Sequence, residues 1–316
     1  MFTVVCLPLC ACGTFGEKST SSVHLAVAWT NTPDSYSYQS TLLSAKESGA
    51  DVTTLDMVKS CDLVYEGESL ADKEKDEHSI LSSSAAKKVK CSRWSGSNAE
   101  EVLKGVDCVI IPGGWDISPT LYYSEQPWHG IEEDGDYSAE RDVSDYLLIS
   151  YCIDHDIPIF CICRGMQMLG VVSGADMIQD IGAWFKDQGI TYDDTHRDPL
   201  RKSFQSHDVQ VLSHDSLLYQ ITKADVIEKV PSWHHQNTGD VSGTRLTVTA
   251  VTETCGIPMI EAVERSDCSF CIGVQYHPEV AVRKTIENEA DAENFMNLDN
   301  GMSIIRAMVQ YCQDQK

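Results

Sequence analysis

Basic residues are scarce in this chain of 316 residues, where 24 Lys and Arg stand against 48 Asp and Glu. The resulting formal net charge of -24 repels phosphate backbones and anionic membrane surfaces. Nucleic acid is therefore not an expected partner. Long apolar runs and internal repeats are lacking too, which argues against a membrane-spanning or solenoid protein. The hydrophobic content of 42% is enough to fill the core of one large domain or two small ones.

The 13 cysteines lack the paired short spacings of a zinc site or of a small disulfide scaffold. We therefore read most of them as buried thiols in a reducing, cytoplasmic compartment. Residues 1–22 are expected to be a flexible extension or a residual leader, because they lack the basic start of a secretory signal. The segment LCACG at residues 9–13 leaves one alternative open, a lipoprotein anchored through Cys12.

Strand-like and helix-like segments alternate from residue 23 onwards, which indicates parallel β-α-β units in a single domain spanning residues 23–316. Strands are expected at 23–29, 52–55, 107–111, 157–162, 209–212, 246–251, 259–263 and 271–275, and helices at 40–49, 139–155, 164–172 and 302–311. Residues 182–201 are expected to form a long loop. Two polar segments without sustained periodicity, 59–101 and 283–300, are expected to be surface insertions.

Cys163 lies at a tight corner between the apolar strand at 157–162 and the helix that follows. In such a corner the helix dipole favours a thiolate over a thiol, and the next backbone N–H can bind an oxyanion. Gly165 leaves room for the close approach that a larger side chain would prevent. The alternative role for Cys163 is that of a buried structural thiol like Cys161, which could also be oxidised against Cys163.

His277 and Glu279 follow the strand at 271–275, in the segment GVQYHPE. Residues two apart at the end of a strand project to the same side, so we expect the carboxylate of Glu279 to bind one imidazole nitrogen of His277. The other nitrogen then remains for a thiol. Together with the Cys163 corner, this pattern predicts a cysteine hydrolase with the triad Cys163, His277 and Glu279.

Several segments occur in an order typical of one family, namely PGGWDISP, ERD, PIFCICRGMQMLG, QD, HHQ and GVQYHPE. The sequence resembles the γ-glutamyl-γ-aminobutyrate hydrolases, within the class I glutamine amidotransferase-like or C26 peptidase group. This resemblance extends over residues 23–282. It implies an α/β fold, a flavodoxin-like three-layer sandwich with a mostly parallel central sheet.

The resemblance also implies roles for individual residues. The backbone N–H groups of Gly114 and Arg164 would bind the oxyanion, and Gln167, His235 and Gln236 would lie near the substrate. Arg164 and Arg141 are candidates for binding the α-carboxylate of the glutamyl group. Neither a metal nor an organic cofactor is expected, because no cluster of carboxylates or cysteines accompanies His234 and His235 in the sequence.

The expected reaction is hydrolysis of a small γ-glutamyl amide through a γ-glutamyl thioester, which yields glutamate and an amine. One alternative is a glutaminase subunit that supplies ammonia to a separate synthetase, although the sequence shows no synthetase domain. Another is a non-catalytic binding or envelope protein on the same fold, which a broken triad would favour. A homodimer is left open.

Overall fold

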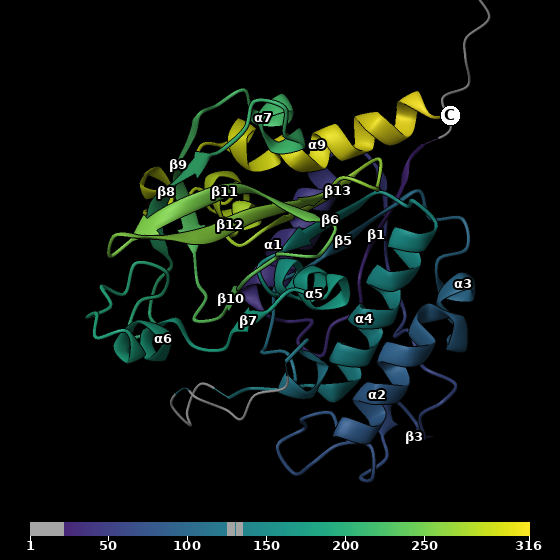
Figure 1. The fold of residues 1–316 in the computed structure, drawn as a ribbon. Helices are drawn as coiled ribbons and strands as arrows, with labels where there is room; N and C mark the ends of the chain where they lie inside the picture. Colours follow the sequence, from purple (N-terminus) through teal and green to yellow (C-terminus); the bar gives the residue numbers. More distant parts are fainter. Residues whose placement is uncertain (1–21, 125–129, 131–134) are drawn as a thin grey trace, which may run out of the picture.

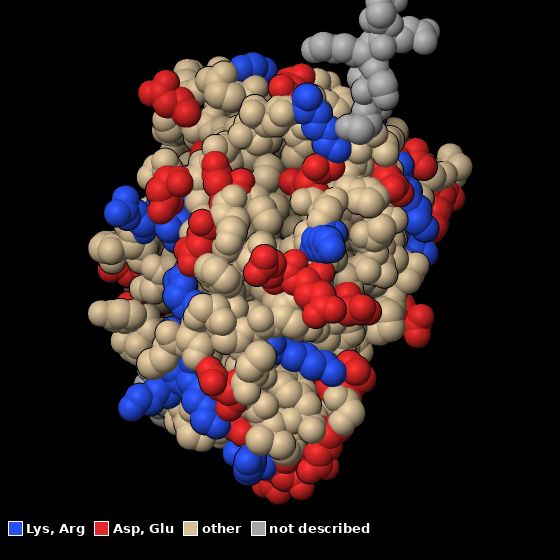
Figure 2. Space-filling model, turned by 90° about the vertical axis from the view of Figure 1, so that its right-hand side faces the viewer, with Lys and Arg blue, Asp and Glu red and all other residues tan. Residues whose placement is uncertain are grey.

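The computed structural model describes residues 22–124, 130 and 135–316. The predictions for the N-terminal extension and for Cys12 fall on residues 1–21, outside the described residues. Within the described part, no helix combines the length and apolar character needed to cross a membrane. Acidic side chains are spread over the face shown in Figure 2, interspersed with Lys and Arg.

A nine-stranded mixed sheet forms the centre of the molecule (Figure 1). Its five parallel strands are, in spatial order, β2 (Asp51–Thr54), β1 (His24–Val27), β5 (Cys108–Ile111), β6 (Ile159–Ile162) and β13 (Cys271–Val274). Four antiparallel strands continue the sheet, namely β12 (Ile257–Arg265), β11 (Leu246–Thr254), β8 (Gln205–Val211) and β9 (Val226–Ser232). Every residue of β5, β6 and β13 is buried, as expected for parallel strands covered on both faces.

Helices cover both faces of the sheet, which confirms the predicted flavodoxin-like sandwich (Figure 1). One face is covered by α1 (Tyr36–Glu47), α7 (Leu217–Thr222), α8 (Pro278–Ile286) and α9 (Leu298–Asp314). The other is covered by α4 (Ala139–Asp154) and α5 (Arg164–Ser173), with α2 (Ser83–Ser92) and α3 (Ala99–Val102) packed outside α4. The remaining short elements are β3 (Tyr65–Glu66), β4 (Ser69–Leu70), β7 (Met177–Ile178), α6 (Ile181–Asp187) and β10 (Asn237–Thr238).

Several element predictions need correction. Segment 59–101 contains α2, whose Ala85, Ala86 and Val89 are buried, although the sequence shows no sustained period there. The helix is only ten residues long, and few apolar residues are enough to seat it against the core. Segment 283–300 likewise includes the end of α8 and the start of α9. The strand β9 and the helix α7 were missed, and α6 occupies the start of the predicted loop.

Candidate active site

Cys163 occupies the sharp turn that joins β6 to α5. Its backbone has φ 51° and ψ -109°, a positive φ that is unfavourable for a residue with a side chain. The N–H of Cys163 donates to the carbonyl of Val274 at 2.7 Å, which ties the turn to the neighbouring strand β13. A Cβ atom at Gly165 would lie 2.3 Å from the carbonyl oxygen of Ile111, so only glycine fits behind the turn. The predicted corner is therefore present.

The two neighbouring thiols, Cys161 and Cys163, lie on opposite faces of the sheet. Cys161 packs in the core beneath α4 and α5, whereas Cys163 belongs to the core on the side of α1 and α8. Residues two apart along a strand share a face, so the change of face comes from the turn after β6, where Cys163 has a positive φ. Burial raises the pKa of Cys161 well above its usual value. A disulfide between these two thiols would require the strand to be remodelled, so the predicted oxidation of the pair is not supported.

His277 and Glu279 are in contact, although not through the predicted strand geometry. His277 lies just before α8 and Glu279 lies in its first turn. The Nδ1 atom of His277 is 2.6 Å from Oε1 of Glu279, and both side chains are buried. Pro278 accounts for the difference, because proline at the first helical position favours the start of a helix there. The contact was predicted correctly, but the local structure that produces it was not.

Ser37, in the first turn of α1, is a third member of this hydrogen-bonded group that the sequence analysis missed. Its Oγ donates to Oε1 of Glu279 at 2.8 Å and lies 3.3 Å from Nδ1 of His277. No motif near residue 37 singles this serine out. Only the packing of α1 against α8 brings it to the site.

The electrostatics favour a charged imidazole at His277. Burial alone would lower its pKa, but the electrostatic interactions with Glu279 and Cys163 raise that pKa well above the ordinary value. Glu279 also hydrogen-bonds to the ring. The imidazole of His277 packs closely against the turn after β5. A Cβ atom at Gly113 would lie 2.8 Å from Cε1 of His277, so this close packing requires glycine at position 113.

Arg141 fixes the conformation of that turn. Its Nη2 donates to the carbonyls of Pro112 and Gly113 at 2.9 Å and 2.8 Å. In a trans peptide the C=O and the following N–H point in opposite directions, so the N–H of Gly114 points away from the guanidinium. A Cβ at Gly114 would lie 1.8 Å from Nη1 of Arg141, and only glycine is compatible with this arrangement.

Arg164 and Arg141 do not fill the predicted role of carboxylate ligands for the substrate. Both guanidinium groups are buried. Arg164 pairs with Asp145 and, at 2.6 Å, with Asp142. Burial alone would lower the pKa of Arg164, yet the two aspartates raise it. Arg141 lies 3.4 Å from Asp145, and burial together with the nearby Arg164 lowers its pKa to about 10. These side chains form an ion cluster between α4 and α5 that supports the site from behind.

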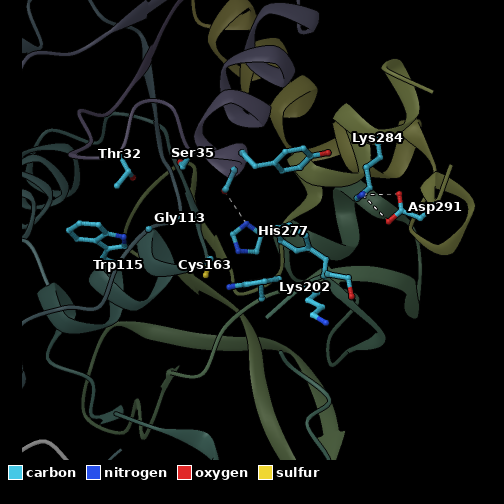
Figure 3. A pocket seen from close by; sticks show the side chains of 15 residues that line it. Thr32, Ser35, Gly113, Trp115, Cys163, Lys202, His277, Lys284 and Asp291 are labelled. Carbon is cyan, nitrogen blue, oxygen red and sulfur yellow. Dashed lines mark hydrogen bonds and ion pairs between the residues drawn. The ribbon is translucent and has the colours of Figure 1, made fainter. Parts of the chain in front are cut away.

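Two cavities meet at Cys163. The larger, about 510 Å³, also exposes His277, Gly113 and Gly114 (Figure 3). Four aromatic side chains form much of its wall, namely Tyr36, Trp115, Phe204 and Trp233. Lys202 and Lys284 also line it. The smaller cavity, about 310 Å³, is lined by polar and charged groups that include Asp116, Gln167, Arg197, His235 and Gln236. The structure thus brings all three predicted substrate-contact residues next to Cys163.

The polar groups of the smaller cavity are held by neighbours. Gln167 Nε2 donates to the carbonyl of Gln236 at 3.0 Å and to Oε1 of Gln275 at 3.2 Å. His235 lies 3.0 Å from Asp116 and 3.3 Å from Asp180. Burial would lower the pKa of His235, but these two carboxylates raise it to about 9, so this imidazole is cationic at neutral pH.

His234 also lines this cavity, and its imidazole belongs to a buried group of four side chains. The others are His196, His207 and Glu261. The expectation that no carboxylate accompanies His234 is therefore wrong in three dimensions. The other members of the group lie up to 38 residues before His234 and 27 residues after it in the sequence. Metal-binding motifs with short spacings therefore could not reveal them.

Comparisons with known proteins agree with this geometry. Residues 90–279, more than half of the chain, match the Peptidase C26 family. Protein NtpR of Enterococcus hirae is 34% identical over 186 residues, which cover 59% of this chain and 72% of that protein. The γ-glutamyl-γ-aminobutyrate hydrolase of Escherichia coli O157:H7 is 31% identical over 182 residues, covering 57% of this chain and 66% of the relative.

Solved structures extend the likeness to nearly the whole chain. A glutamine amidotransferase from Thermotoga maritima superimposes with a TM-score of 0.50 at 14% identity, covering 93% of this chain and 99% of that one. At this identity the likeness concerns the fold alone. This chain belongs to the Peptidase C26 family of hydrolases that act on amide bonds, and it has the class I glutamine amidotransferase fold.

Proposed function

We propose that this protein hydrolyses γ-glutamyl amides of small amines through a thioester on Cys163. The observation that carries the proposal is the grouping of the strained Cys163 turn with the buried His277–Glu279 pair at the junction of two cavities. The relative from Escherichia coli O157:H7, named as a γ-glutamyl-γ-aminobutyrate hydrolase, suggests the substrate class.

In the first half of the reaction, the thiolate of Cys163 attacks the γ-carbonyl carbon of the substrate. The carbonyl oxygen gains a negative charge and accepts hydrogen bonds from the backbone N–H groups of Gly114 and Arg164. The imidazolium of His277 then donates its proton to the amide nitrogen. The C–N bond breaks, the amine departs, and the glutamyl group remains bound to sulfur as a thioester.

In the second half, the neutral imidazole of His277 accepts a proton from a water molecule. The resulting hydroxide adds to the thioester carbonyl, the C–S bond breaks and glutamate leaves. This step restores the thiolate of Cys163 and the imidazolium of His277. The carboxylate of Glu279, 2.6 Å from Nδ1, stabilises the imidazolium.

The two cavities suggest how the substrate is divided. The smaller one presents cationic and acidic groups, among them His235, Arg197 and Asp116, which suit the α-carboxylate and α-ammonium groups of a free glutamyl end. The larger cavity then receives the amine half against its aromatic wall. An α-linked glutamyl peptide cannot present both charged groups while placing its amide at Cys163.

Lys202 gives the amine half a testable preference. It lies on the rim of the larger cavity, and its Nζ has no hydrogen-bond or ion-pair partner among the residues that the structure describes (Figure 3). The nearby Lys284, in contrast, is held by Glu289 and Asp291 at 2.8 Å. We expect Lys202 to bind a terminal carboxylate on the departing amine, such as that of γ-aminobutyrate.

The experiment compares γ-glutamyl-γ-aminobutyrate with γ-glutamyl-butylamine, an analogue of similar shape that lacks the terminal carboxylate. Because Lys202 is exposed, the ion pair contributes at most about 1 kcal/mol. Replacing Lys202 by Met should therefore raise KM up to about fivefold for the first substrate and leave the second unchanged. Lys186 lines a neighbouring cavity whose lining does not include Cys163, and Lys186→Met provides the matched control.

The wider test is a panel of γ-glutamyl amines, α-glutamyl peptides and glutamine, assayed for glutamate release by the purified protein alone. We expect the γ-glutamyl amines to be cleaved at least roughly a hundredfold faster than α-glutamyl peptides, since the latter leave buried polar groups unpaired. Ammonia release from glutamine only when a second protein is added, with γ-glutamyl amines left intact, would favour a glutaminase subunit instead.

A further inference from the structure

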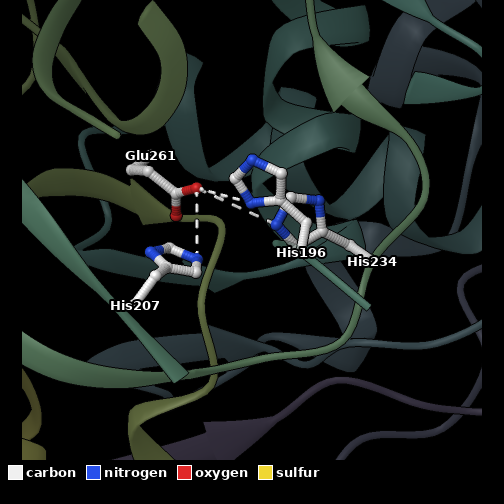
Figure 4. Close-up of side chains that lie close together, drawn as sticks. All are labelled: His196, His207, His234 and Glu261. Atoms are coloured by element: carbon white, nitrogen blue, oxygen red, sulfur yellow. Dashed lines mark ion pairs between the residues drawn. The ribbon is translucent and has the colours of Figure 1, made fainter. Parts of the chain in front are cut away.

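A buried group of three histidines and one glutamate lies beside the active site (Figure 4). His196 belongs to the connection between α6 and β8, His207 to β8, His234 to the segment after β9, and Glu261 to β12. The side chains of His196 and Glu261 are 0% exposed, and those of His207 and His234 are 6% and 2% exposed. The ligand atoms of all four lie within 4.8 Å of one another.

The atoms that face one another lack hydrogen bonds. They are Nδ1 of His196, Nε2 of His207, Nε2 of His234 and both carboxylate oxygens of Glu261, and none has a hydrogen-bond partner among the described residues. The three nitrogens lie 3.3 Å, 3.6 Å and 3.9 Å, respectively, from Oε1 of Glu261. Leaving so many polar atoms unpaired in the interior is costly, at about 1–3 kcal/mol each.

The opposite nitrogen of each imidazole, in contrast, has a partner. Nε2 of His196 is 2.8 Å from the hydroxyl of Thr254, and Nδ1 of His207 is 3.1 Å from that of Thr252. Nδ1 of His234 is 2.9 Å from the carbonyl of Gln236. Such outer contacts orient histidines that bind metal ions, because they fix which nitrogen faces inward.

The protonation states suit the same role. Burial lowers the pKa of His196 to about 4 and holds the pKa of His234 well below its ordinary value. These imidazoles are therefore neutral at physiological pH, and a neutral imidazole is the form that binds a metal. Burial also raises the pKa of Glu261 to about 7 in the metal-free protein. A bound cation would remove that cost by stabilising the carboxylate.

We propose that His196, His207, His234 and Glu261 bind one divalent transition-metal ion, with Zn²⁺ as the best match. Three nitrogens and one carboxylate oxygen supply the four ligands of a closed tetrahedral zinc shell, which leaves no position for a catalytic water. Zinc–ligand bonds of about 2.0–2.1 Å place tetrahedral ligand atoms roughly 3.3 Å apart, so the group, whose ligand atoms lie within 4.8 Å of one another, contracts around the bound ion.

The site would stabilise the substrate cavities rather than take part in the reaction. His196 anchors residues 188–204, and its neighbours Arg197, Lys202 and Phe204 line the cavities at Cys163. The N–H of His234 also donates to the carbonyl of His196 at 3.1 Å, next to His235 of the smaller cavity. A metal ion would therefore join the loop to the strands β8 and β12 directly behind the site.

Metal content is the first test. The protein is purified untagged with Cys61→Ser and Cys91→Ser, because exposed thiols are a ligand type that can take up zinc nonspecifically, and it is analysed by elemental mass spectrometry. We expect about one zinc per chain after zinc loading and dialysis, and loss of that zinc in His207→Gln and Glu261→Gln. His214→Gln is the matched control, because His214 is exposed and lies outside the group.

Two further measurements test the site even if the ligand variants fail to fold. Thr254→Val removes only an outer contact of His196 and should weaken zinc affinity roughly 10- to 100-fold. Cobalt added to the metal-free protein should give the intense visible bands of a four-coordinate ion, and one equivalent of zinc should abolish them. Bands of six-coordinate cobalt, or equal zinc content in the control and the Glu261→Gln variant, would overturn the proposal, as would no retained zinc in the folded protein.

Discussion

Replacing Glu279 by Gln removes the negative charge next to His277 while keeping the size of the side chain. Glu279 Oε1 lies 2.6 Å from Nδ1 of His277, and both groups are buried, so solvent screens their interaction little. An opposite charge at this distance changes the pKa of a neighbour by about 1–3 units. We therefore expect the pKa of His277 to fall by roughly that amount in the variant.

The sign of the effect on activity follows from the mechanism. The imidazolium form of His277 protonates the departing amine, so kcat/KM decreases as pH rises through the pKa of His277. Glu279 raises that pKa. In Glu279→Gln the decrease should therefore begin about 1–3 pH units lower than in the wild type, and kcat should drop roughly 10²- to 10⁴-fold.

The assay is the pH profile of kcat/KM for γ-glutamyl-γ-aminobutyrate, with circular dichroism to verify the fold. Ser37→Ala is the control, because it removes a hydrogen bond to Glu279 but keeps the charge. Its profile should match that of the wild type. A Glu279→Gln enzyme whose alkaline decrease stays at the wild-type pH would refute the argument that Glu279 acts through the charge on His277.

Three other substitutions test the surroundings of the site. Gly114→Ala places a methyl group 1.8 Å from a buried nitrogen of Arg141. We therefore expect the unfolding free energy to fall by about 1–3 kcal/mol and kcat to drop 10²- to 10³-fold. Wild-type stability in denaturant melts together with a wild-type kcat would contradict this. Arg164→Met removes the cation that pairs with Asp142 and the closer of the two that pair with Asp145, so we expect the unfolding free energy to fall by about 3–5 kcal/mol with KM unchanged. A large rise in KM alone would instead restore Arg164 as a substrate ligand. Cys161→Gly should retain activity because this thiol faces away from the site, and complete loss with an intact fold would mean that the wrong thiol was assigned.

The central part of the fold could be predicted from the sequence because its strands are continuous apolar runs. The segments IFCI and CIGV read as buried strands, and both are fully buried in the structure. The Cys163 turn was predictable for the same reason, since it directly follows one of these strands. Elements at the periphery gave weaker signals: β9 alternates exposed and buried residues irregularly, and α2 has only three buried positions.

The parts of the site that sequence reasoning missed depend on long-range packing. Ser37 reaches Glu279 only because α1 lies against α8, 242 residues away in the chain. The partners of His234 were missed because Glu261 comes from a strand on the antiparallel side of the sheet. Arg164 was misassigned since a guanidinium next to a nucleophile suits a substrate carboxylate equally well, and only the fold shows that Asp142 and Asp145 already bind it.

The most direct test of the account is to trap the covalent intermediate. Wild-type protein is mixed with a γ-glutamyl amine, quenched in acid within the first turnovers and digested for peptide mass spectrometry. We predict that the peptide containing Cys163 gains the mass of one glutamyl group, and that Cys163→Ser shows neither this adduct nor glutamate release. Turnover by Cys163→Ser at near wild-type rates, or an adduct on a different cysteine, would contradict the assignment of Cys163 as the nucleophile.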